Sequence, residues 1–190
     1  MRGITQDTII VVVACHFENQ ETICKTTRAR LEAALQEPDA KNAIWYTTGS
    51  VPYVSGSPLL SELMKKFLME HGISKETIFT GAGYSTFSDA EAVMADIAFR
   101  FPRRRVVAVS SDWFWSSGIP VYGAEARRYG IPISFIHVAN TGGSYTHRFY
   151  CIYGYAVRLA FFFRMQKLLA VVLERLQSGR KNGFTWDGCR

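Results

Sequence analysis

Apolar runs of strand length alternate with amphipathic segments of helix length along most of this chain. Five short runs rich in β-branched residues stop at small or polar residues, which is typical of strands that are buried on both faces. We predict strands over 8–14, 44–48, 77–80, 106–110 and 133–138. The run 106–110 is apolar without interruption, so we expect it to be central in the sheet.

The segments between these runs carry helical periodicity and helix start or stop signals. Ser57-Pro58 combines a cap with a first-turn proline, and Ser88 to Glu91 reads as a capping box. We predict helices over 21–35, from Ser57 to His71-Gly72, from Ser88 to about Arg100, from near Pro120 to Tyr129, and from about Tyr150 to Leu176.

Strands that alternate with helices imply right-handed crossovers and a parallel sheet covered on both faces. The predicted fold is therefore α/β, a three-layer doubly wound sandwich with about five parallel strands and a long apolar C-terminal helix. The length of 190 residues corresponds to one domain, which we place at 1–177. The polar, glycine-bearing tail 178–190 is expected to be mobile.

Composition favours a small anionic partner. The net charge is +6, but the basic residues are scattered, so no nucleic-acid partner is expected. The densest run, 103–105, reads as a solvated loop before a strand, with a phosphate contact as the alternative. The four cysteines lack CxxC spacing, and no run is long and uncharged enough to span a membrane. These features predict a cytoplasmic location with reduced thiols, and they leave the oligomeric state open.

The predicted C-terminal helix is apolar almost all round. Phe161 to Phe163 lie between Arg158 and Arg164. Burial against the sheet or at a subunit interface explains this pattern. The alternative is a peripheral contact with a membrane surface.

Small and polar residues follow the predicted strands, and parallel strands bring such residues to one edge of the sheet. Backbone N–H groups at helix starts, together with serine and threonine hydroxyls, favour a phosphate or carboxylate of a small molecule. For each turn the alternative is a purely structural bend or cap. The candidate ligand-binding residues at strand ends are Thr48, Gly49, Ser50, Gly81, Gly83, Ser85, Thr86, Ser110 and Ser111, and Asn140-Thr141 would join them.

Charged and aromatic candidates complete this predicted crevice. Arg30 or Arg148 would neutralise the anion, Arg148 from a segment 144–150 that could act as a lid. Trp113 could stack on a planar ligand or pack against the C-terminal helix. His16 and Asp112 would supply any proton transfer. No GxSxG elbow supports a serine nucleophile, and no metal is expected because the third candidate ligand, His137, lies inside a strand.

Several of these segments resemble the YdcF/SanA/ElyC-like domain family of bacteria. The matching pieces, in order over about residues 8–176, are Ile9 to Ala14, Arg30 in RLEAAL, Thr48-Gly49-Ser50, His71 to Ile78, Ser85 to Ala90, and Val109 to Trp113. The resemblance implies a Rossmann-like domain that binds S-adenosylmethionine or another nucleotide-like anion in some members and has a cell-envelope role in others. The chain departs from the family pattern at Ser85, where the family has Asn, and at Ser88, where it has Glu. It also lacks the family's His and Arg between Asp112 and Arg127.

The sequence therefore favours a small-molecule enzyme or binder with a phosphate- or carboxylate-recognising crevice. The alternative is a non-catalytic cell-envelope or regulatory binding module. The missing His and Arg after Asp112 favour that alternative, because a module that only binds needs no acid or base.

Overall fold

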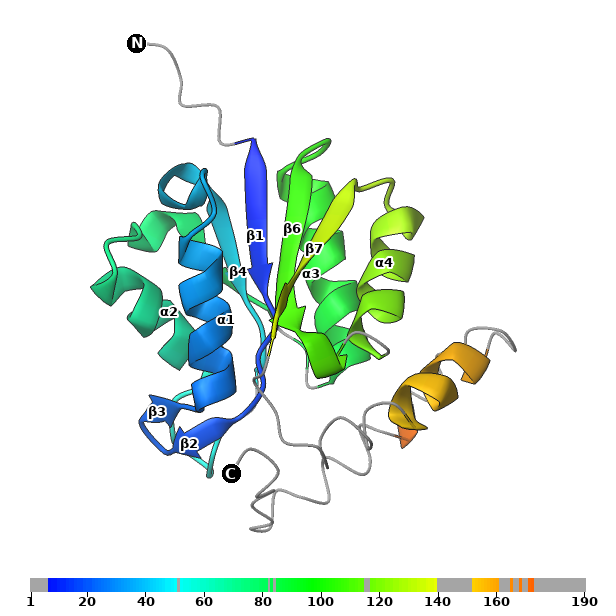
Figure 1. Ribbon diagram of the computed structural model, residues 1–190, viewed down its shortest axis with the longest axis horizontal. Helices are drawn as coiled ribbons and strands as arrows, with labels where there is room; N and C mark the ends of the chain where they lie inside the picture. The colour runs from blue at the N-terminus through cyan, green and yellow to red at the C-terminus, as the bar shows by residue number, and fades with distance from the viewer. Residues whose placement is uncertain are drawn as a thin grey trace.

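The computed structural model confirms the α/β fold (Figure 1). It describes residues 7–50, 52–81, 83, 85–114, 117–139 and 152–160, together with residues 165, 168, 171 and 172. The predicted mobile tail 178–190 lies outside the described residues.

Five parallel strands form the main sheet, in the order β5-β4-β1-β6-β7. β1 is in the middle and β6 lies next to it, so the strand that we expected to be central is an inner strand but not the middle one. The winding direction of the chain reverses between β1 and β6, which makes their ends the topological switch point of the sheet. The strands are β1 (Thr8–Val12), β4 (Ile44–Thr47), β5 (Ile78–Thr80), β6 (Arg105–Ser111) and β7 (Ile133–Val138).

Two pairs of helices cover the two faces of this sheet. Figure 1 shows α1 (Lys25–Leu35) and α2 (Leu60–Glu70) on one face, and α3 (Thr86–Arg100) and α4 (Gly118–Arg128) on the other. This arrangement is the predicted three-layer, doubly wound sandwich.

The middle strand shows why the apolar runs have no polar interruptions. Ile10 and Val12 pack in one core cluster with residues of α1 and α2, whereas Ile9 and Val11 pack in a second cluster with residues of α3 and α4. All four side chains are completely buried. Because both faces of β1 are covered, a polar side chain at any of these positions would be removed from water at a cost in free energy, and the run therefore stays apolar.

The first helix begins later than predicted. Thr22 and Ile23, which we assigned to its start, instead form β3 (Thr22–Ile23), which pairs antiparallel with β2 (Phe17–Asn19). The N-cap of α1 is Cys24, so the helix begins at Lys25 rather than at Glu21. The β-branched pair in β3 pairs with β2 instead of extending the helix.

The second helix also begins later than predicted, at Leu60 rather than at Ser57. The hydroxyl of Ser57 closes a local turn, because it accepts a hydrogen bond from the Val54 N–H at 3.1 Å. The Glu62 carboxylate accepts the Leu59 N–H at 2.9 Å, which caps the helix from inside its first turn.

The third helix begins earlier than predicted. Its N-cap is Ser85, and Ser85 and Ser88 form a reciprocal capping box, so Ser88 is the third helical residue and not the first. The predicted ends of two other helices are confirmed. Gly72 and Gly130 follow α2 and α4 with φ of +83° and +66°, a conformation that glycine adopts without steric cost.

The described part of the chain also contains short 3-10 helices: η1 (Ala40–Asn42), η2 (Lys75–Thr77) and η3 (Asp112–Phe114). Residues 152–160 are helical, and Val157 is completely buried in the core cluster of the α3/α4 face. Most of the remaining predicted C-terminal helix lies outside the described residues. Within the described part, no helix has the length and apolar character needed to cross a membrane.

Candidate functional site

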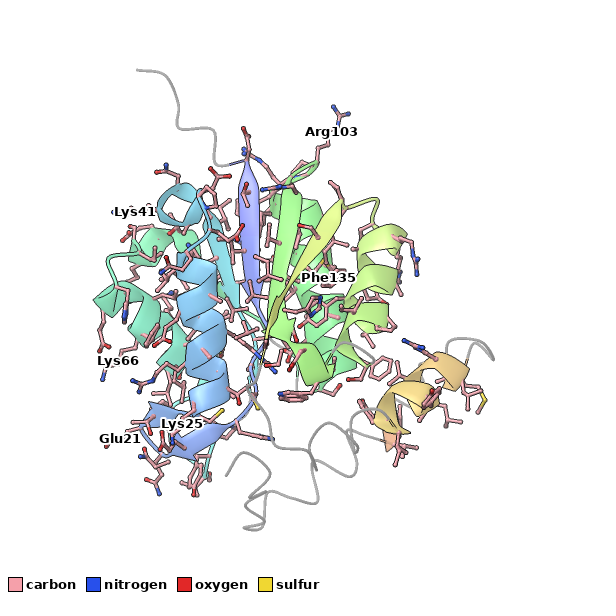
Figure 2. All side chains as sticks on the ribbon, viewed as in Figure 1. Glu21, Lys25, Lys41, Lys66, Arg103 and Phe135 are labelled. Carbon is pink, nitrogen blue, oxygen red and sulfur yellow. The ribbon has the colours of Figure 1, made fainter. Side chains whose placement is uncertain are left out.

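The carboxyl ends of the parallel strands lie together at the lower edge of the sheet in Figure 1. Figure 2 shows Arg103 and Lys41 at the opposite edge. The basic run 103–105 thus belongs to the amino-terminal edge of β6, where Arg104 forms an ion pair of 2.7 Å with Asp7. This placement agrees with the predicted solvated loop and separates the run from the carboxyl edge.

Arg30 is completely buried, and its guanidinium connects the ends of β1 and β6. Its Nη1 donates hydrogen bonds to the carbonyl oxygens of Val13 at 2.6 Å and Ala14 at 3.0 Å. Its Nε donates to the Ser111 hydroxyl at 2.9 Å. The side chain points back toward the start of its helix, as long side chains do. Arg30 and Ser111, two of the predicted ligand-binding residues, therefore meet at the switch point.

The positive charge of Arg30 has no anionic partner in the described part of the chain. No ion pair there includes Arg30, and its Nη2 has no hydrogen-bond partner among the described residues. The guanidinium lies 5.2 Å from the centre of the Trp113 ring and 5.7 Å from that of Phe114. Aromatic faces attract a cation, but they do not replace a counter-ion.

Trp113 occupies the interior and not the surface. Its side chain is only 4% exposed, it meets Phe114 edge-on, and the guanidinium of Arg30 lies over its ring. It belongs to the same core cluster as Val157 of the helical segment 152–160. Trp113 therefore packs in the interior. The guanidinium of Arg30 lies over the ring on which we considered that a planar ligand could stack.

The two serines at the end of β6 lie on opposite faces of the sheet. Ser111 faces Arg30, whereas Ser110 faces an apolar crevice beside Phe114, Tyr122 and Phe135 that has no room for a water molecule. Figure 2 shows Phe135 at this position between β7 and α4. The structure therefore brings Ser111, but not Ser110, to the Arg30 site.

The two predicted glycine turns are bonded to each other. Ser50 follows β4, and its N–H donates to the carbonyl oxygen of Gly83 at 3.1 Å. The Ser50 hydroxyl donates to the carbonyl oxygen of Gly81, which follows β5. The turns form one assembly at the carboxyl edge, but their polar groups already have partners within the protein.

Asp89 of α3 lies at the centre of this assembly, and sequence reasoning missed it. Its carboxylate accepts a long hydrogen bond of 3.4 Å from the Gly49 N–H and another from the Gly83 N–H. The side chain is buried, and burial raises its pKa to about 7, against the opposing effect of these two bonds. An aspartate in a first helical turn is common, so no sequence signal distinguished it.

The packing of Gly83 explains why glycine stands there. A Cβ atom at this position would lie 2.1 Å from the Asp89 backbone nitrogen. The turn thus lies directly on the first turn of α3. The Asp89 carboxylate thus accepts hydrogen bonds from the N–H groups that we expected to bind a ligand anion.

Thr48 links this assembly to the Arg30 site. Its hydroxyl accepts a hydrogen bond of 2.9 Å from the Ala14 N–H. Nearby, burial raises the pKa of the Tyr122 phenol far above its usual value; the charge of Asp89 adds to this effect and the charge of Arg30 opposes it. Tyr122 is therefore in electrostatic contact with both buried charges.

Ser85 and Thr86 serve the start of α3. Ser85 is the N-cap, and its hydroxyl accepts the Ser88 N–H at 3.2 Å. Thr86 is the first helical residue. These residues therefore form the structural cap that we gave as the alternative to ligand binding.

The proton-transfer candidates lie at the ends of the two strands next to the switch point. His16 follows β1, and its carbonyl oxygen accepts the Cys24 N–H at 3.0 Å. Asp112 follows β6 and accepts the Trp113 N–H at 2.8 Å. His137 of β7 contacts the backbone of Ser111 and the charge of Asp112. Burial lowers the pKa of this imidazole, against the opposing effects of those two neighbours.

Arg148, Asn140-Thr141 and the predicted lid 144–150 lie outside the described residues. In the ranges that the structure does describe, no group of three or more histidine, cysteine or acidic side chains has an arrangement that could hold a metal ion.

The geometry thus joins Arg30, Ser111 and the end of β1 into one buried polar cluster at the switch point, and it joins the glycine turns into a second cluster around Asp89. Comparison of this chain with models of known families, with curated proteins and with solved structures found no match.

Proposed function

We propose that this protein binds a small molecule through a phosphate or carboxylate group, and that Arg30 is the charge partner of that group. One observation carries the proposal: Arg30 is completely buried at the switch point, with an unused Nη2 and no anionic partner among the described residues. A buried charge without a counter-ion is costly, and a bound anion removes that cost.

The chemistry around Arg30 suits an oxyanion. A guanidinium presents its N–H donors in a planar fork, and Nη2 keeps its donors available beside Ser111. Lys25, Thr26 and Thr27 begin α1 without an acidic side chain. The dipole of this eleven-residue helix therefore adds to the attraction for an anion at the same edge.

The ligand class follows from site and sequence together. The switch point of a doubly wound sheet is where such folds bind their ligands. The resemblance to the YdcF/SanA/ElyC-like family adds nucleotide-like molecules, including S-adenosylmethionine, as candidates. If the ligand reacts, we assign proton transfer to Asp112 and His16, which follow β6 and β1.

A thermal-shift screen with sulfate, inorganic phosphate, adenosine monophosphate and S-adenosylmethionine tests the proposal. At ten times the dissociation constant, a ligand stabilises the folded state by about 1.4 kcal/mol and raises Tm by about 3–6 °C for a chain of this size. We expect at least one probe to give a saturable shift.

Arg30→Met separates an anion site from a structural arginine, because methionine keeps an apolar side chain of similar length without the charge. The matched control is Arg28→Met, which removes an exposed arginine from the same helix. The shift should disappear in Arg30→Met and persist in Arg28→Met. An equal shift in both variants, or no shift with any probe, would overturn the proposal.

A further inference from the structure

A continuous set of bonds connects Asp89 to Arg30. The Asp89 carboxylate accepts the Gly49 N–H, and the neighbouring Thr48 hydroxyl accepts the Ala14 N–H. The Ala14 carbonyl oxygen in turn accepts a hydrogen bond from Nη1 of Arg30. The path runs from α3 through the turn after β4 and the end of β1 to α1.

The charges of Asp89 and Arg30 also act on one shared neighbour. The phenol of Tyr122, contributed by α4, is in electrostatic contact with both Asp89 and Arg30. The turns that pack against Asp89 contribute backbone N–H groups, and none of their described residues is charged. Among the described residues of other elements, Tyr122 is an ionisable group that the charge of Asp89 reaches, and the charge of Arg30 reaches the same phenol. All three side chains are buried.

We propose that Asp89 is a positioning residue for the Arg30 site and that ionisation of Asp89 opposes the binding of an anion there. This inference rests on the proposed function. A bound anion adds negative charge near a carboxylate that is already poorly solvated, so each disfavours the other. By linkage, an anion that binds more tightly when Asp89 is protonated also raises the pKa of Asp89 when it binds.

The predicted signature is a pH profile of anion affinity near neutrality. Burial raises the pKa of Asp89 to about 7, so its charge changes between pH 6 and pH 8. The affinity for an anion of constant charge should fall by about fivefold or more over this interval. Burial lowers the pKa of His137 from its ordinary value, so its charge changes at lower pH than that of Asp89.

Calorimetric titration of the full chain with sodium sulfate tests the inference, because sulfate keeps its charge from pH 6 to pH 8. The dissociation constant is measured at pH 6, 7 and 8 at fixed ionic strength for the wild type and for Asp89→Asn. The amide of asparagine keeps the shape of the side chain but does not ionise. The wild-type affinity should fall with pH, and the affinity of Asp89→Asn should change by less than half as much on a logarithmic scale.

A second measurement needs no variant. The amide signals of Gly49 and Gly83 should follow the ionisation of Asp89 in a pH series of NMR spectra. Saturating sulfate should raise the midpoint of their titration by about 0.7 pH unit, because linkage makes this shift equal to the logarithm of the fivefold change in affinity.

The outcomes separate this inference from the proposed function. Sulfate binding that is lost in Arg30→Met, but has the same pH profile in the wild type and Asp89→Asn, would overturn the role of Asp89 alone. An unchanged glycine midpoint with sulfate would do the same if Asp89→Asn does not fold. Absence of saturable sulfate binding at every pH would overturn both.

Discussion

Replacement of Asp89 by asparagine should change how the stability of this protein depends on pH. In the folded protein, burial raises the pKa of Asp89 to about 7 from an ordinary value of 3.8. Between these two values the folded chain holds a proton that the unfolded chain has released. Unfolding therefore releases a proton in this interval, and the free energy of unfolding contributed by Asp89 falls as pH rises toward 7.

The magnitude follows from the size of the pKa change. One pKa unit corresponds to about 1.36 kcal/mol, so a change of roughly three units corresponds to about 4 kcal/mol between pH 4 and pH 8. Other titrating groups occur in both proteins and cancel in the comparison. Any cost of the asparagine amide facing the Gly83 N–H is independent of pH, so it shifts the curve without changing its slope.

Urea unfolding followed by circular dichroism, in half-unit steps from pH 4.5 to pH 8.5, measures this difference. The stability of Asp89→Asn minus that of the wild type should rise steadily to pH 7 and level off near pH 8. A difference that stays constant over the whole range would refute the raised pKa, and a difference that falls would reverse the sign of the argument.

Three further substitutions test the packing of the carboxyl edge and the core. Gly83→Ala should destabilise the fold by about 3 kcal/mol in urea unfolding, because its Cβ would lie 2.1 Å from the Asp89 nitrogen. Gly118→Ala should cost about 1–3 kcal/mol in the same assay, since its Cβ would lie 2.0 Å from the Phe114 ring; a loss below 0.5 kcal/mol would show that the ring moves freely. Ile10→Ala should lower the free energy of unfolding by about 2–5 kcal/mol in the same assay, because this side chain is completely buried in the middle strand.

The sheet could be predicted because its inner strands β1, β4 and β6 are buried almost throughout, so they read as apolar runs that end at polar residues. Ile133–Val138 matches its predicted bounds, and β1 and β4 end one or two residues early. The hairpin before α1 could not be predicted as easily. Its second strand has only two residues, Thr22–Ile23, and these fit the periodicity of the following helix.

The candidate site was predicted in part. Arg30 and Ser111, two of the predicted ligand-binding residues, meet because parallel strands end at one edge. The opposite placement of Ser110 follows from the period of two along a strand, a signal that the sequence contains and that our prediction did not use. The role of Asp89 could not be predicted, because the pairing of two turns that are distant in sequence creates its environment.

The central claim is that Arg30 pairs with a bound anion, and the Nε–H signal of this residue in a proton–nitrogen NMR spectrum tests it most directly. The guanidinium is completely buried and its Nε donates to Ser111, so the proton should exchange slowly enough to be observed. Titration with sulfate or adenosine monophosphate should shift this signal to saturation, together with the amide signals of Val13 and Ala14. A signal that stays in place while the protein binds the anion elsewhere would contradict the claim.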